Sequence, residues 1–67
     1  MNILKFKGAL AERGVTQEFV AHIIGVNPST FYRKLASGGE KFTVGEIQRM
    51  MKKIPLTEEE AINIFLR

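Results

Sequence analysis

The sequence predicts an all-helical fold, with one compact domain that contains five helices. Three observations lead to this prediction. Apolar residues recur along most of the chain at the spacing of a helix face. Threonine, asparagine, glycine and proline stand between the apolar segments, where helix starts and ends favour them. The 67 residues are 45% hydrophobic, which suits a single small domain with its own core.

The first helix is expected at residues 2–13, where Asn2 can cap its start and Gly14 can end it. The apolar residues that share one side of it are Ile3, Phe6 and Leu10. A glycine inside a helix costs about 1 kcal/mol relative to alanine. Because Gly8 lies inside this segment, the helix is expected to depend on tertiary packing or to make a close helix contact there.

Two short helices are expected at residues 17–24 and 28–37, joined by a tight turn. Thr16 can cap the first of them, and Gly25 is placed for the left-handed residue that ends it. Pro28 suits the first position of the second helix. The residues expected to hold the two helices together are Val20, Ala21, Ile24, Val26, Phe31 and Leu35.

A fourth helix is expected at residues 44–54. Thr43 and Glu46 have the spacing of a capping box, and Pro55 prevents the helix from continuing. The residues spaced to face a core are Val44, Ile47, Met50, Met51 and Ile54.

A fifth helix is expected at residues 58–66, with a second capping box formed by Thr57 and Glu60. It is short and apolar on more than one side. One side is therefore expected to pack on the domain, and another to meet a second copy of the chain.

Residues 16–35 match the pattern Thr-Gln-Glu-x-Val-Ala-x-x-x-Gly-Val-x-x-x-Thr-Phe-Tyr-Arg-Lys-Leu. This pattern resembles the helix-turn-helix of phage repressors and Cro-like regulators, the Xre family, and in particular small regulators encoded in Gram-positive prophages. A second stretch found in those regulators, Phe-Thr-x-x-Glu-Ile, is matched by residues 42–47. The resemblance covers nearly the whole chain and implies a lambda-repressor-like domain with its helix-turn-helix at the second and third helices.

The resemblance further implies that the third helix enters the major groove of DNA and that its first turn faces the bases. The residues expected to contact bases are Pro28, Ser29, Tyr32 and Arg33. The residues expected to contact phosphates are Gln17, Asn27, Thr30, Lys34 and Lys41. Arg33 is the sharpest candidate, because a guanidinium group can bond to guanine O6 and N7 together. A solvated or phosphate-bound Arg33, and a Tyr32 that only covers the helix seam, are the alternatives.

The family also implies a homodimer, at least on DNA, whose two third helices lie about 34 Å apart on one face of the duplex. The residues expected in the interface are Ile64, Phe65 and Leu66. Phe19 and Ile23 are apolar at positions that are usually polar in this motif. We expect them to pack against the first or the fifth helix, and an exposed patch is the alternative.

Charge is distributed unevenly along the chain, whose formal net charge is +3. Residues 28–53 hold six basic and two acidic residues, a net charge of +4, and residues 54–67 hold one basic and three acidic residues, a net charge of −2. The sequence thus predicts a positive end that contains the third helix. This polarity suits DNA, because phosphate contacts supply most of the non-specific affinity.

Other classes of function find little support. The chain has no cysteine and one histidine, so no metal site or cofactor is expected. His22 has no serine or cysteine partner at a telling spacing, and neither catalytic residues nor enzyme activity are expected. The apolar runs fall far short of the roughly 20 residues of a membrane helix. No small-molecule ligand is evident, and a cytoplasmic, nucleoid-associated location is expected.

The sequence therefore predicts a repressor of phage or mobile-element origin that binds a palindromic operator in double-stranded DNA. The alternative is a protein-interaction module, antitoxin-like or a phage accessory protein, that has kept the fold and binds a protein partner. The operator and the sign of regulation stay open, as does whether the chain is a whole regulator or one domain of a longer protein.

Overall fold

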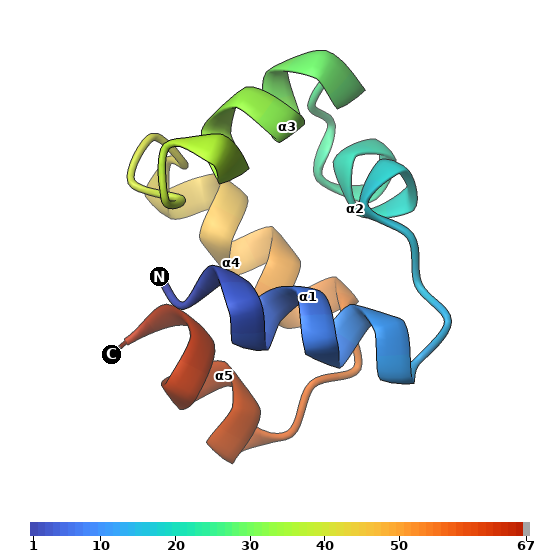
Figure 1. The fold of residues 1–67 in the computed structure, drawn as a ribbon, viewed down its shortest axis with the longest axis vertical. Coiled ribbons are helices and arrows are strands. Elements are labelled where there is room, and N and C mark those ends of the chain that lie inside the picture. The colour runs from blue at the N-terminus through green and yellow to red at the C-terminus, as the bar shows by residue number, and fades with distance from the viewer. Residues whose placement is uncertain (67) are drawn as a thin grey trace.

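The computed structural model describes residues 1–66 and folds them into five α-helices (Figure 1). The helices are α1 (Ile3–Glu12), α2 (Gln17–Ile24), α3 (Pro28–Ala36), α4 (Val44–Lys53) and α5 (Glu58–Phe65). All five predicted helices are confirmed. The second has the predicted bounds, the others end one residue earlier than predicted, and α1 also begins one residue later. None of the helices in residues 1–66 is long and apolar enough to cross a membrane.

The helix starts are fixed by the side chains that the sequence identified as caps. Asn2 Oδ1 accepts a hydrogen bond from the N–H of Lys5 at 3.0 Å. Thr16 Oγ1 accepts one from the N–H of Phe19 at 3.0 Å. Thr43 and Thr57 each form a complete capping box with the glutamate three residues later. Since one such cap contributes roughly 1 kcal/mol, these local contacts account for much of the agreement between predicted and observed bounds.

A row of four phenylalanine rings runs through the core and joins distant parts of the chain. The ring centroid of Phe6 lies 6.5 Å from that of Phe31 and 6.3 Å from that of Phe65. The Phe31 ring in turn lies 5.4 Å from Phe42, in the loop before α4. The other buried apolar residues around this row are Ala9, Leu10, Val20, Ala21, Ile24, Leu35, Met50, Ile54 and Ile64. The row holds α3 against α1 and α5.

The helices α1 and α5 pack together at the end of the molecule away from α3 (Figure 1). The N–H of Asn2 donates to the carbonyl of Ile64 at 2.7 Å. At the other end of α1, the guanidinium of Arg13 donates to Glu60 Oε2 and to the carbonyl of Pro55, each at 3.0 Å. The first and last helices are thus fastened at both ends, and α3 is left at the opposite edge.

Two core predictions for α4 and one for α2 were wrong. Val44 is 74% exposed and Met51 is also exposed, although their spacing suits a core. Phe19 was expected to pack against a neighbouring helix, yet it is 53% exposed, whereas Ile23 does pack against the core. The reason is geometric. Neighbouring elements bury only Met50 and Ile54 fully among the apolar residues predicted for α4, with Ile47 partly covered.

Candidate nucleic-acid interface

The turn between α2 and α3 is held from both sides. Gly25 ends α2 in the left-handed region with φ 76°, a conformation that strains residues with a side chain. The N–H of Val26 then donates back to the carbonyl of Ala21 at 2.9 Å. From α4, Arg49 Nε donates to the carbonyl of Ile24 at 3.0 Å, which satisfies a backbone group that the end of α2 leaves open. The relative placement of α2 and α3 is therefore fixed by backbone and side-chain bonds.

The start of α3 is built around Asn27. Its Oδ1 accepts hydrogen bonds from the Ser29 N–H at 2.9 Å and from the Ser29 hydroxyl at 2.6 Å. Pro28 occupies the first turn, as predicted. Because the cap uses the carbonyl oxygen of Asn27, the side-chain NH₂ group of this exposed residue is the donor that could reach a phosphate. Ser29 donates its proton to the cap, so its hydroxyl presents acceptor lone pairs outward.

The outward side of α3 is polar. Phe31 and Leu35 are buried in the core. Ser29, Arg33 and Ser37 are spaced four residues apart and are exposed, so they form one row along the side opposite the core. Figure 1 shows α3 along the edge of the molecule, where its outer side faces no other helix. We call Ser29, Arg33 and Ser37 the outer row.

The outward side of α3 includes two residues that the sequence did not identify, Ser37 in the outer row and Ala36 beside it. Tyr32 is exposed, yet its ring lies 6.2 Å from that of Phe31 in an edge-on arrangement, so it covers the seam and also reaches solvent. Ala36 is exposed one turn after Tyr32. Ala36 and Ser37 lie in the last turn of α3 or just after it, whereas the family resemblance points to the first turn. Their spacing of four residues from Tyr32 and Arg33 is the signal that could have identified them.

A shallow depression of about 370 Å³ lies beside the outer row, between α3 and the loop that follows it. The residues that line it are Thr30, Arg33, Lys34, Ser37 and Lys41. The structure thus brings three of the predicted phosphate contacts together, with Arg33 next to them. The Arg33 guanidinium donates to Thr30 Oγ1 at 3.1 Å, which uses one of its five N–H groups.

Lys34 is engaged in an ion pair within the domain. Its Nζ lies 2.7 Å from Oε1 and 3.0 Å from Oε2 of Glu46, a buried carboxylate, and 5.7 Å from the centre of the Phe42 ring. Burial raises the pKa of Glu46, but hydrogen bonds from Lys34 and from Thr43 lower it by more, and the net pKa is below its ordinary value. The predicted phosphate contact at Lys34 does not fit this pairing, because the charge is already neutralised by Glu46.

The other flank of the interface is the start of α2. Gln17 is the first residue of α2 and is partly exposed. It therefore lies at the amino-terminal end of the helix, where free backbone N–H groups favour a phosphate. Nearby, a shallow groove of about 400 Å³ is lined by Thr16, Glu18, Phe19, His22, Val26 and Pro28. The exposed Phe19 ring therefore borders the first turn of α3. The sequence predicted instead that this ring would pack against the first or the fifth helix.

The predicted positive end of the molecule is divided. Lys52 and Lys53 form the last turn of α4, which ends beside the carboxyl end of α1, since Arg13 binds the carbonyl of Pro55 there. Figure 1 shows this end of α4 away from α3. The net charge of +4 in residues 28–53 consequently does not gather on one surface. Within residues 1–66, Arg33 and Lys41 take part in no ion pair, and they supply the positive charge of the depression beside α3.

The residues predicted for a dimer interface on α5 also need correction. Ile64 is 1% exposed and belongs to the core, so it is not available to a second copy. Phe65 is half-buried against Phe6. Of the three predicted residues, only Leu66, which is 71% exposed, lies open to solvent. The apolar character of α5 is mostly explained by packing inside the domain.

No family model matches the chain, and neither a curated protein nor a solved structure does. The resemblance of residues 16–47 to phage regulators accordingly remains a hypothesis. Its support consists of the residues themselves and of the turn and outer row into which they fold.

Proposed function

We propose that this chain is a sequence-specific DNA-binding regulator that places α3 in the major groove of double-stranded DNA and represses transcription by occupying promoter DNA. The observation that carries the proposal is the outer row, an exposed polar line on a helix at the molecular edge, held by a braced turn. A short helix with a polar outer side and a fixed turn is the form in which helix-turn-helix proteins read bases. Two copies on a palindromic operator would place their α3 helices about 34 Å apart.

The proposed contacts follow from the positions of the side chains. The base-reading residues are Ser29 and Arg33 at the centre, with Pro28 and Tyr32 beside them. Arg33 would leave Thr30 and place its guanidinium on guanine O6 and N7. The phosphate contacts are Gln17, Asn27, Thr30 and Lys41. Lys34 is excluded from this set because it neutralises Glu46.

Fluorescence anisotropy with a random DNA duplex at two salt concentrations tests the proposal. We expect binding at low salt that weakens steeply as salt rises, because bound counterions are released from the phosphates. Lys41→Met should weaken binding and lower the salt slope by about one, as expected for one lost phosphate contact. Lys7→Met on α1 removes the same charge from an exposed site and should change neither quantity. No binding at low salt would contradict DNA reading.

A second candidate function is protein binding, which the exposure of Phe19 favours. The large apolar ring of Phe19 borders a groove at the start of α2 and α3, where it could contact an apolar side chain of a protein partner. Glu18 lines the same groove and would repel a phosphate. Phe19 is not one of the proposed DNA contacts, so Phe19→Ser should leave DNA affinity nearly unchanged if DNA is the partner. No affinity for DNA in the wild type, together with binding of a protein partner that Phe19→Ser abolishes, would favour protein binding instead.

A further inference from the structure

The outward side of α1 contains a glycine that nothing inside the domain explains. A glycine inside a helix costs about 1 kcal/mol relative to alanine. A Cβ atom added to Gly8 would meet no other atom within 4 Å in the described part of the chain. The close helix contact that the sequence suggested at Gly8 is therefore not made within the domain. The open space at this position is available to something outside it.

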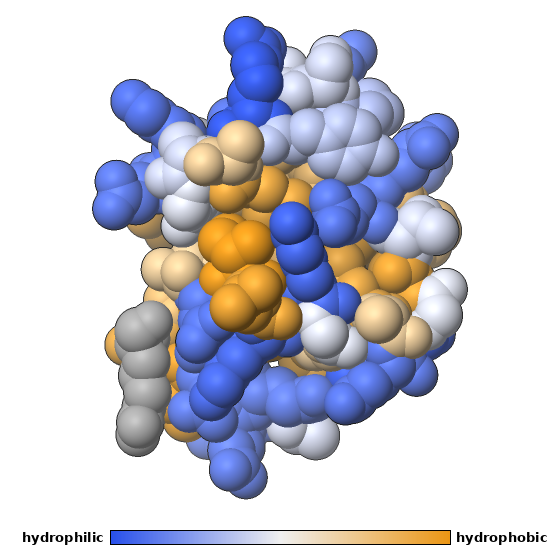
Figure 2. Space-filling view, in the orientation of Figure 1, coloured by the Kyte–Doolittle hydropathy of each residue, from blue (hydrophilic) through white to orange (hydrophobic). Residues whose placement is uncertain are grey.

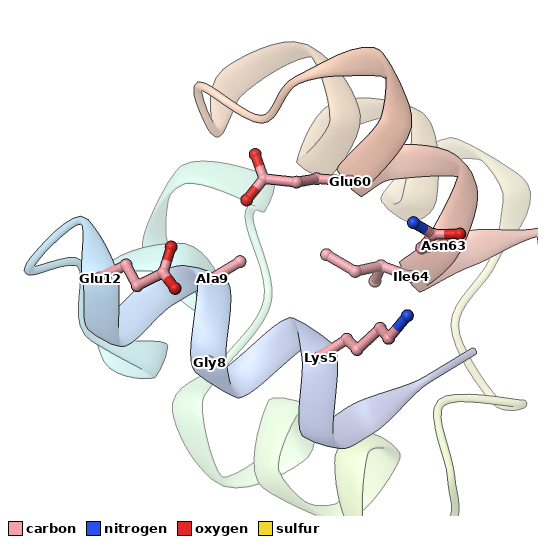
Figure 3. A pocket seen from close by; sticks show the side chains of 7 residues that line it. All are labelled: Lys5, Gly8, Ala9, Glu12, Glu60, Asn63 and Ile64. Atoms are coloured by element: carbon pink, nitrogen blue, oxygen red, sulfur yellow. The ribbon is translucent and has the colours of Figure 1, made fainter.

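Gly8 borders a groove of about 240 Å³ between α1 and α5 (Figure 3). Ala9 and Ile64 form its apolar floor, and both are buried. Figure 3 shows Lys5 and Glu12 on α1 to either side of Gly8, so that one charge of each sign stands at the two ends of the groove. The groove is thus apolar in the middle and oppositely charged at its ends.

The two charges stand at nearly equal distances from the glycine, with Lys5 three residues before it and Glu12 four residues after it. Lys5 and Glu12 are seven residues apart, which puts them on one side of the helix and about 10 Å apart along its axis. Their midpoint falls between Gly8 and Ala9. Both side chains are exposed, and neither takes part in an ion pair among residues 1–66. Glu60, the other acid at the groove, is already paired with Arg13.

We propose that this side of α1 binds a second copy of the chain, with the two α1 helices antiparallel and crossing at Gly8. In that arrangement Lys5 of one copy faces the partner's Glu12, and Glu12 faces the partner's Lys5. A two-fold axis requires such a self-complementary surface, in which each residue and its partner exchange roles. A different protein would not require charges of opposite sign at nearly equal distances on the two sides of the glycine.

An exposed leucine adds apolar area to the same side. Leu4 lies one turn before Gly8 and is 83% exposed. Figure 2 shows an apolar patch near the beginning of α1, surrounded by hydrophilic side chains. In the antiparallel pair, Leu4 of each copy adds apolar contact area one turn from the crossing. The outer row lies on the side of α3 opposite Phe31, whose ring packs on Phe6 of α1, so pairing through the outward side of α1 leaves the outer row exposed.

Sedimentation equilibrium of the full chain without DNA tests this pairing. We expect a dimer whose association constant falls as salt rises. Lys5→Glu and Glu12→Lys should each weaken it about tenfold, because each change turns two attractive pairs into two repulsive ones. An equimolar mixture of the two variants should associate as well as the wild type, since only the mixed dimer restores both pairs. Lys7→Glu, on the same helix but outside the groove, is the matched control and should leave association nearly unchanged.

Gly8→Ala provides a second measurement that misfolding cannot imitate. The substitution should raise the melting temperature of the monomer, because alanine favours the helix and its Cβ meets nothing within the chain. The same substitution should weaken association, because the helices approach most closely there. A wild type that stays monomeric at every concentration would overturn the proposal, as would a mixture that associates no better than either single variant. These measurements use no DNA, so their failure leaves the proposal for α3 untouched.

Discussion

Lys34 Nζ lies 2.7 Å from Oε1 of Glu46, and the same Oε1 accepts the N–H of Thr43 at 2.9 Å. One carboxylate therefore begins α4 and also holds α3. The arrangement occurs twice, because Glu60 caps α5 and pairs with Arg13 at the end of α1. Each capping box in the chain thus joins its own helix to an earlier one.

Lys34→Met should lower the free energy of unfolding by about 1–3 kcal/mol, because it leaves a buried carboxylate without its charged partner. Urea unfolding at neutral pH would measure the loss. Lys41→Met removes an exposed lysine from the same depression and should stay within about 0.5 kcal/mol of the wild type. Equal stability of the two variants would show that the ion pair contributes nothing.

Stability should fall as the solution becomes acidic. Burial raises the pKa of Glu46, but the hydrogen bonds from Lys34 and Thr43 together lower it by a larger amount. The net pKa therefore lies below the ordinary value of 4.5. A carboxyl group with a lowered pKa stabilises the fold above its ordinary pKa, and this contribution disappears as pH falls through the lowered value.

We therefore expect the free energy of unfolding of Glu46→Gln to depend less on pH below about 4.5 than that of the wild type. Glutamine can still accept the N–H of Thr43, so the capping box is retained. Urea unfolding across this range is the measurement, with Glu40→Gln as an exposed control. The same acid-induced loss in Glu46→Gln as in the wild type would contradict the assignment.

Arg49 should matter to both stability and binding, since it satisfies the last carbonyl of α2 beside the turn. Arg49→Leu should lower the free energy of unfolding by about 1 kcal/mol and also weaken DNA binding, because the turn is loosened. Lys52→Leu makes the same charge change elsewhere on α4 and is the matched control for unfolding and anisotropy measurements. If the two variants gave the same stability and the same DNA affinity, the bond from Arg49 to Ile24 would not stabilise the turn.

Gln17→Ala should weaken the binding of all DNA sequences by the same factor, because a phosphate contact carries no base information. Anisotropy titrations with selected and random duplexes would measure the two affinities. A loss confined to the selected duplex would mean that Gln17 reads bases.

Much of the fold was predictable because it depends on local chemistry. Helix starts follow from side chains that bond to amides two or three residues away, as at Thr16 and Thr43. The sharp end of α2 follows from Gly25 alone. The exposure of Ser29 and Arg33 could be predicted from Phe31. Once Phe31 faces the core, helix geometry places residues two positions away on the opposite, solvent-facing side.

What the sequence did not predict depends on which surfaces meet. The pairing of Lys34 with Glu46 and the bond from Arg49 to Ile24 join residues 12 and 25 positions apart. Apolar spacing also could not show that neighbouring helices leave Val44 74% exposed. Such contacts depend on how the helices are placed relative to one another. Periodicity identifies only which side of each helix is apolar.

Selection of bound sequences from a random DNA pool tests the central claim most directly. We expect the wild type to enrich a palindrome with half-sites about one helical turn apart and a guanine preference in each half. Arg33→Ala should lose that preference at one base pair per half-site, worth about 1–3 kcal/mol, and keep the remainder of the palindrome. Recovery of no common sequence by the wild type, or of the same sequence by both proteins, would contradict base reading by α3.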